Sequence, residues 1–177
     1  MKTAVILAAG EGSKCWPYSP TRNKSVVPIA NKPIIQWTIE ALRAHGIENI
    51  LIVTGYRKEQ IAYAVGHYEN IAFIEQKGGS GTVAALLSAW DVVEEESFLV
   101  FYGDVLVTSE NVGALIDRAN QHQPLAAALL QPLAWSPARS GDASFWWGLC
   151  SHKKIRTFFA QESGANARHS GGNDAAG

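Results

Sequence analysis

The sequence predicts an α/β protein in which a mostly parallel central sheet lies between two layers of helices. Short apolar stretches rich in β-branched residues alternate five times with helical patterns, and short links join them. The chain has 177 residues, of which 47% are hydrophobic, so it is long enough to bury a core without disulfide or zinc support. We therefore expect a three-layer α/β/α, Rossmann-like sandwich whose second half is truncated or diverged.

The first strand is expected at residues 3–8, a continuous apolar run that suits a strand buried on both faces. It ends at Gly10-Glu11-Gly12, which predicts a turn, and a polar loop with several prolines extends to about residue 32. Pro33 suits the first turn of a helix, because its missing N–H would have no partner there. The apolar stripe of this helix continues to Gly46, a suitable residue just beyond a helix end.

The remaining elements follow the same alternation. Strands are expected at 50–54, 71–75, 98–102 and 125–130, and helices at 58–65, 82–93 and 111–120. Beyond Gln131 the pattern decays: Trp135 and the run 145–147 show no clear period, and 154–159 fits one more strand. Residues 163–177 contain no large apolar side chain, so we expect a folded domain over 1–162 and a flexible tail after it.

Composition excludes several classes of protein. Lys plus Arg number 15 and Asp plus Glu 16, and this balance argues against a nucleic-acid binder. The two cysteines, Cys15 and Cys150, form no C-x-x-C pair, which argues against a zinc ribbon or a redox dithiol and favours the cytoplasm. No apolar run approaches the ~18 residues of a membrane span, so no membrane association is expected.

Ligands of parallel α/β sheets bind beyond the carboxyl ends of the strands, which directs attention to three loops. In the first, Gly10-Glu11-Gly12-Ser13-Lys14, successive amides can hold phosphate oxygens, and Lys14 and Lys24 could add positive charge. An ordinary glycine-rich turn is the alternative, since a lone G-x-G also suits a turn without a ligand. Cys15 stands where a dinucleotide fingerprint has its third glycine, which disfavours an NAD-dependent oxidoreductase.

The other two loops carry polar side chains. Asp104 follows Gly103 directly after a strand, which suits a magnesium ligand but equally a turn-forming Gly-Asp pair. Gln76 and Thr82 flank the third loop and could read the edge of a base, although each alone also suits a solvated loop. The five histidines show no spacing typical of metal ligands.

Together these segments resemble the signature of sugar-1-phosphate nucleotidylyltransferases over about residues 1–130. The first motif runs along Leu7-Ala8-Ala9-Gly10-Glu11-Gly12-Ser13-Lys14 and continues with Pro17, Lys24, Val27-Pro28 and Asn31-Lys32-Pro33. The second joins Gln76 to Gly81-Thr82, and the third is the strand 98–102 followed by Gly103-Asp104. The resemblance is closest to glucose-1-phosphate thymidylyltransferases and to the uridylyltransferase half of bifunctional N-acetylglucosamine-1-phosphate enzymes.

The resemblance implies that a sugar 1-phosphate and a pyrimidine nucleoside triphosphate, dTTP or UTP, give an NDP-sugar and pyrophosphate. It implies Lys14, Lys24 and Asp104 as catalytic residues, with Asp104 holding Mg²⁺. It implies the following nucleotide-binding residues: Leu7, Ala8, Ala9, Gly10, Gly12, Ser13, Gln76, Gly81, Thr82 and Gly103. The partners are then the two substrates, and a homo-oligomer is compatible with the family.

The chain also departs from this family. Lys14 replaces the usual Arg, and Asn23 replaces the usual Pro before Lys24. Ala160-Gln161 stands where the family has a paired acid and base near the sugar, and the chain stops before the second metal-binding residue. A fragment or a diverged copy is expected, and a catalytically impaired nucleotide-binding or regulatory paralogue is the alternative function.

Overall fold

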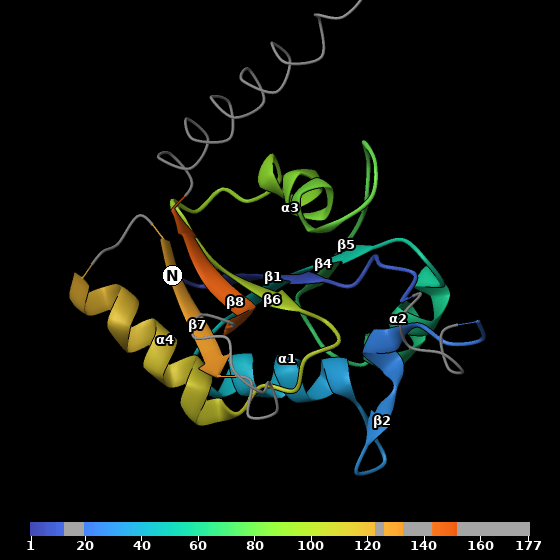
Figure 1. Ribbon diagram of the computed structural model, residues 1–177, viewed down its shortest axis with the longest axis horizontal. Coiled ribbons are helices and arrows are strands. Elements are labelled where there is room, and N and C mark those ends of the chain that lie inside the picture. Colours follow the sequence, from blue (N-terminus) through green and yellow to red (C-terminus); the bar gives the residue numbers. More distant parts are fainter. Residues whose placement is uncertain (13–19, 123–125, 133–142, 152–177) are drawn as a thin grey trace, which may run out of the picture.

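The computed structural model describes residues 1–12, 20–122, 126–132 and 143–151, which form a six-stranded sheet with helices on both faces (Figure 1). The strand order is β5-β4-β1-β6-β8-β7. The predicted three-layer α/β/α architecture is confirmed. Predictions for residues 13–19, 133–142 and 152–177, including the strand at 154–159 and the tail, lie outside the described residues.

Four strands form the parallel part of the sheet. They are β1 (Thr3–Leu7), β4 (Asn49–Thr54), β5 (Ile71–Glu75) and β6 (Ser97–Tyr102). β1 lies between β4 and β6 and is buried along its whole length. This position explains why its sequence is a continuous apolar run rather than an alternating one.

Helices cover the two faces unequally. α1 (Ile34–Ala44), α2 (Lys58–Val65) and α4 (Ser109–His122) lie on one face, and α3 (Thr82–Trp90) lies on the other (Figure 1). α3 is shorter than the helix expected at 82–93, because the chain turns after Trp90.

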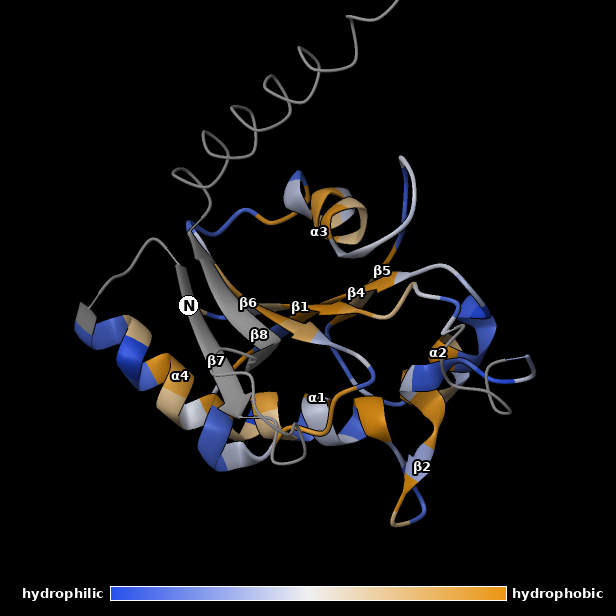
Figure 2. Cartoon of the chain, in the orientation of Figure 1, coloured by the Kyte–Doolittle hydropathy of each residue, from blue (hydrophilic) through white to orange (hydrophobic). Residues whose placement is uncertain are grey.

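Alternate residues of each strand serve the two faces, so the domain has two apolar clusters. From β1, Ala4 and Ile6 pack on the side of α1, α2 and α4, whereas Val5 and Leu7 pack toward α3. The ring of Trp90 on α3 meets the ring of Phe98 edge-on, with centroids 5.8 Å apart. The hydropathy colouring shows the apolar central strands between these layers (Figure 2).

The far side of the sheet contains a strand that the sequence analysis missed. β8 (Ala143–Ser151) pairs antiparallel with β6 and with the edge strand β7 (Ala126–Pro132), which is the expected fifth strand. Because both neighbours are antiparallel to β8, β7 runs in the same direction as β6. Two features hide the two-residue period of β8 in the sequence. The pairing of β7 with β8 has a register shift at Leu129/Leu130, and β8 lies between two other strands.

The loop expected at 11–32 contains short regular elements where it is described. η1 (Lys24–Val26) is a single 3₁₀ turn, and β2 (Pro28–Ile29) and β3 (Lys32–Pro33) form a hairpin. Its two turn residues, Ala30 and Asn31, both have positive φ, as a tight hairpin turn requires.

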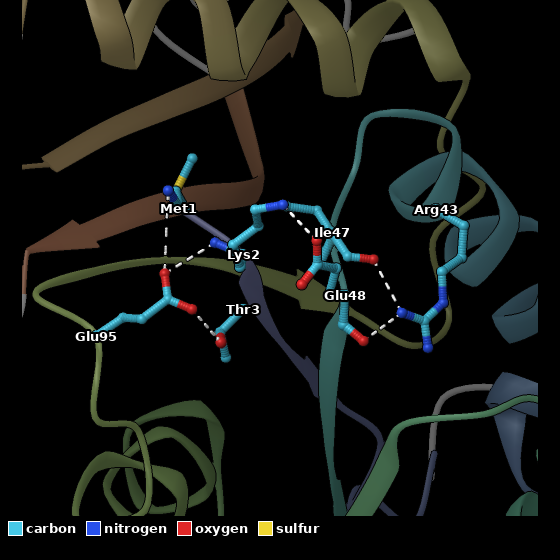
Figure 3. Close-up of polar contacts among 7 residues, drawn as sticks. All are labelled: Met1, Lys2, Thr3, Arg43, Ile47, Glu48 and Glu95. Carbon is cyan, nitrogen blue, oxygen red and sulfur yellow. Dashed lines mark hydrogen bonds and ion pairs between the residues drawn. The ribbon is translucent and has the colours of Figure 1, made fainter.

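The amino end of β1 is fastened by charged side chains, at the sheet edge opposite the loops of interest (Figure 3). The Glu95 carboxylate accepts hydrogen bonds from the backbone N–H of Lys2 at 2.8 Å and from Thr3 Oγ1 at 2.5 Å. Lys2 also pairs with Glu48, and Arg43 donates to the carbonyl oxygen of Ile47 at 2.9 Å. These contacts join the starts of β1 and β4 to the segment before β6. None of the helices in the described ranges is both long and apolar enough to span a membrane.

Candidate active site

A cavity of about 360 Å³ opens at the carboxyl ends of β1, β5 and β6. Most of the predicted site residues that the structure describes line it: Leu7, Ala8, Ala9, Gly10, Lys24, Gln76, Gly81, Thr82 and Asp104. Ser13 and Lys14 lie outside the described residues. The fold thus brings the three predicted loops to one place, as expected for strands that end at the same edge of a parallel sheet.

The loop after β1 starts from a backbone that is held by β4 and by the loop that follows β4. The N–H of Ala8 donates to the carbonyl oxygen of Val53 at 2.9 Å, which prolongs the pairing with β4. The carbonyl oxygen of Ala9 accepts from the N–H of Tyr56 at 3.1 Å. Gly10 follows as an exposed residue with no atom within 4 Å of a Cβ built there. Its backbone is therefore open to close approach by a ligand.

The central polar contact of the cavity is an ion pair between Lys24 and Asp104. Lys24 Nζ lies 2.5 Å from Asp104 Oδ2, and the two side chains are 28% and 30% exposed. Gly12 has a φ of +70°, and a Cβ there would lie 2.5 Å from Lys24 Cγ. Gly12 therefore supports the site by leaving room for the lysine stem, although it does not line the cavity.

The opposite wall is formed by Gln76, Gly81 and Thr82. Gln76 Nε2 donates to the carbonyl oxygen of Gly79 at 2.8 Å, so this amide nitrogen fastens the glycine-rich loop. Thr82 begins α3, and its Oγ1 accepts a long hydrogen bond of 3.5 Å from the hydroxyl of Tyr102. The role of these side chains in reading a base stays a prediction.

Four cavity-lining residues escaped the sequence analysis: Ser25, Ala85, Tyr102 and Val105. Ser25 is 2% exposed and follows Lys24. No local pattern marks it, because its place depends on how η1 packs against Ala8 and Gly103. Tyr102 is the last residue of β6 and could have been found from the rule that strand ends line the site.

Gly103 does not line the cavity, but it leaves room for Ser25 and Ala8 to pack together. Its N–H donates to the carbonyl oxygen of Leu7 at 2.9 Å, and a Cβ at Gly103 would lie 2.6 Å from Ser25 Oγ and 3.0 Å from Ala8 Cβ. We expect Gly103→Ala to lower the free energy of unfolding by about 1–3 kcal/mol, the usual cost of overpacking. Gly10→Ala is the matched control, since a Cβ there meets nothing. Urea denaturation of both variants is the measurement, and equal stabilities would contradict a packing role for Gly103.

The cavity contains one carboxylate among the residues that the structure describes, that of Asp104. Within the same ranges, no group of three or more His, Cys, Asp or Glu side chains forms a ready metal cage. Mg²⁺ in phosphoryl-transfer sites is usually bound by one or two carboxylates together with substrate phosphates. The donor set therefore fits Mg²⁺ that arrives with a phosphorylated ligand.

A glycine loop, a lysine and a carboxylate at this edge of a parallel sheet are typical of α/β proteins that bind phosphorylated ligands. Residues 3–140 match the family described as Nucleotidyl transferase. The chain belongs to this family.

Several curated relatives match more than half of the chain. "Bifunctional protein GlmU" of Methanocaldococcus jannaschii is 40% identical over 103 residues, which are 58% of this chain and 25% of that protein. "UTP--glucose-1-phosphate uridylyltransferase AglF" of Haloferax volcanii is 30% identical over 141 residues, 76% of this chain and 56% of that protein. The chain thus spans between a quarter and about half of the length of these relatives.

Solved structures support the fold. A UDP-glucose pyrophosphorylase from Acinetobacter baumanii superposes with a TM-score of 0.69 at 21% identity, covering 88% of this chain and 76% of that chain. A glucose-1-phosphate thymidylyltransferase described as putative, from Bacillus anthracis, superposes with a TM-score of 0.70 at 20% identity, covering 85% and 72%.

Proposed function

We propose that the chain is a sugar-1-phosphate nucleotidylyltransferase that makes an NDP-sugar and pyrophosphate from UTP or dTTP. The observation that carries this proposal is the Lys24–Asp104 pair, which lines the same cavity as the exposed Gly10. Family membership and the names of the relatives support the reaction type. We also propose that residues 1–162 form the nucleotidyl transferase domain of a cytoplasmic protein, for which a homo-oligomer is compatible.

In this reaction an oxygen of the sugar 1-phosphate attacks the α-phosphorus of the nucleotide in line. A new P–O bond forms while the bond to pyrophosphate breaks, so no side-chain nucleophile or general base is required. The backbone after Gly10 holds the triphosphate, and the family resemblance assigns Lys14 to the leaving pyrophosphate. Lys24 neutralises the charge that develops on the transferred phosphoryl oxygens. Asp104 would hold Mg²⁺, which would neutralise phosphate charge and orient the oxygens.

The pyrimidine base is assigned to the wall formed by Gln76 and Thr82. Both residues line the cavity, and the hydroxyl of Tyr102 lies 3.5 Å from Thr82 Oγ1. An amide and a hydroxyl can match the donors and acceptors of a base edge, and the choice of a pyrimidine is carried over from the family resemblance.

The alternative is a catalytically impaired nucleotide-binding or regulatory paralogue. The observation that favours it is Ala160-Gln161, where the resembled family has a paired acid and base. The nucleotide-side residues would then remain useful for binding while the attacking phosphate is poorly placed. Small misalignments of a reacting group can cost about 100-fold in rate.

Calorimetry with dTTP, UTP, ATP and GTP, each with and without Mg²⁺, tests the proposed function. We expect Mg²⁺-dependent binding in which the pyrimidine nucleotides bind about tenfold more tightly, equivalent to about 1.4 kcal/mol. Equal affinity for all four would contradict the assignment of Gln76 and Thr82.

Pyrophosphate release with glucose 1-phosphate then separates the two candidates. Tight binding with a single-turnover rate well below the ordinary range of about 1–1000 per second would favour the impaired paralogue. A rate within that range would establish a working transferase and show that positions 160 and 161 need no acid and base.

A further inference from the structure

The turn that carries Lys24 cannot hold itself in place. η1 spans three residues, and its closing hydrogen bonds, from the N–H of Val26 to Asn23 O and from the N–H of Val27 to Lys24 O, are both 3.2 Å long. Single 3₁₀ turns have poor hydrogen-bond geometry and little stability alone. The direction in which Lys24 leaves the backbone must therefore be set by contacts outside the turn.

Those contacts come from Asn23, whose side chain is almost completely buried, at 1% exposure. Its Nδ2 donates to the carbonyl oxygen of Tyr56 at 2.7 Å and to that of Ala8 at 3.2 Å. Its Oδ1 accepts from the N–H of Ser25 at 2.9 Å and so caps η1. Both donors and one acceptor position of the amide are used, which few other side chains could reproduce.

The backbone of Asn23 is held as well. Its N–H donates to Oε1 of Gln60 at 2.8 Å, and Gln60 Nε2 donates to the carbonyl oxygen of Thr21 at 3.0 Å. Gln60 stands on α2, which therefore braces the segment before Lys24. The amide of Asn23 and that of Gln60 together connect α2, the loop after β4 and the end of β1.

We propose that Asn23 is the positioning residue for Lys24: it fixes the lysine relative to the phosphate-holding loop and to Asp104. Ala8, one of its partners, itself lines the cavity, and Lys24 is the next residue in the chain. Asn23 therefore sets the distance between Lys24 and the loop after β1. It does so without contacting substrate itself. This inference rests on the proposed function for the meaning of Lys24, but its structural part can be tested without turnover.

The first test is the rate at which an amine-reactive reagent modifies Lys24, read by peptide mass spectrometry. Lys32 is an internal control, because its Nζ also lies 2.5 Å from a carboxylate oxygen, that of Glu40, at a similar exposure of 26%. We expect Asn23→Ala to raise the modification rate of Lys24 severalfold while that of Lys32 stays constant. Equal acceleration of both lysines, or of neither, would overturn the proposal.

Two further variants guard against a general loss of structure. Gln60→Ala removes only the brace from α2, so a smaller acceleration confined to Lys24 is expected. Gln36→Ala is the matched control: its Nε2 donates to the carbonyl oxygen of Ala64 at 2.7 Å, an equivalent amide contact that does not reach Lys24. If Gln36→Ala accelerates Lys24 as much as Gln60→Ala does, the effect is general loosening and the proposal fails.

Turnover gives the second test through a double-mutant cycle. Asn23→Ala should lower the single-turnover rate at least tenfold while the nucleotide Kd changes less than threefold. In a Lys24→Met background the same substitution should have almost no further effect, because a residue that acts through Lys24 has nothing left to position. Equal losses in both backgrounds would overturn the proposal. If the parent neither binds nucleotide nor turns over, the proposed function fails, whereas the modification experiment still decides the role of Asn23.

Discussion

Lys24→Met should lower the single-turnover rate of nucleotidyl transfer by about 100- to 1000-fold, the usual cost of losing one preorganised charge at a reacting centre. Methionine keeps most of the length of the side chain but removes the charge and its hydrogen bonds. Asp104, 30% exposed, then loses its partner at 2.5 Å and can be hydrated, so the fold should survive. Rapid-quench measurement of pyrophosphate release is the assay, with nucleotide affinity measured in parallel.

Lys32→Met is the control for the Lys24 variant. Lys32 makes an ion pair of the same length with Glu40, but it lies on the β2–β3 hairpin and does not line the cavity. Its loss should leave the single-turnover rate within about twofold of the parent, because pairs of this exposure contribute less than about 1 kcal/mol. If both variants lose the same amount of rate, the effect of Lys24 is one of stability rather than of transition-state charge.

The parallel half of the fold could be predicted because each strand carries its own local signal. The run at 3–8 is apolar without alternation, and the strand it becomes, β1, is buried between two neighbours. The helices at 58–65 and 82–90 likewise begin close to the expected residues. Short connections then leave a parallel sheet as the only simple arrangement.

The antiparallel insertion of β8 could not be predicted in the same way. Residues 103–142 separate β6 from β8, and residues 133–142 separate β7 from β8. Its own sequence has tryptophans at adjacent positions, which supports neither a two-residue nor a helical period. Only its pairing with β6 and β7, set by tertiary structure, assigns it to the sheet.

The residues of the candidate site show the same contrast between those that the sequence could predict and those that it could not. Gly10, Gln76 and Asp104 stand at strand ends, so a rule about parallel sheets was enough to place them together. Asn23, by contrast, appeared only as a departure from a family pattern. Its importance depends on three carbonyl and amide groups from β1, the loop after β4 and η1, which no local pattern in the sequence brings together.

Asp104→Asn should abolish the Mg²⁺ dependence of nucleotide binding and lower turnover by more than about 100-fold, since metal charge stabilisation is worth several kcal/mol in such transfers. An amide coordinates Mg²⁺ far more weakly than a carboxylate, and it also removes the negative partner of Lys24. Calorimetric titration of UTP at several Mg²⁺ concentrations measures the first effect directly. The variant should keep the thermal stability of the parent, because the side chain is partly solvated and the turn geometry is unchanged by an isosteric amide.

Glu75→Gln provides the comparison that makes the Asp104 result specific. Glu75 also ends a parallel strand and pairs with a lysine, Lys58, at 3.0 Å, but it does not line the cavity. Its variant should respond to Mg²⁺ as the parent does. If Asp104→Asn also responds like the parent, Asp104 is a turn residue that happens to face the cavity, and the metal must be held by substrate phosphates or by groups beyond those described. If both variants lose the response, the metal effect is one of overall charge at this end of the sheet.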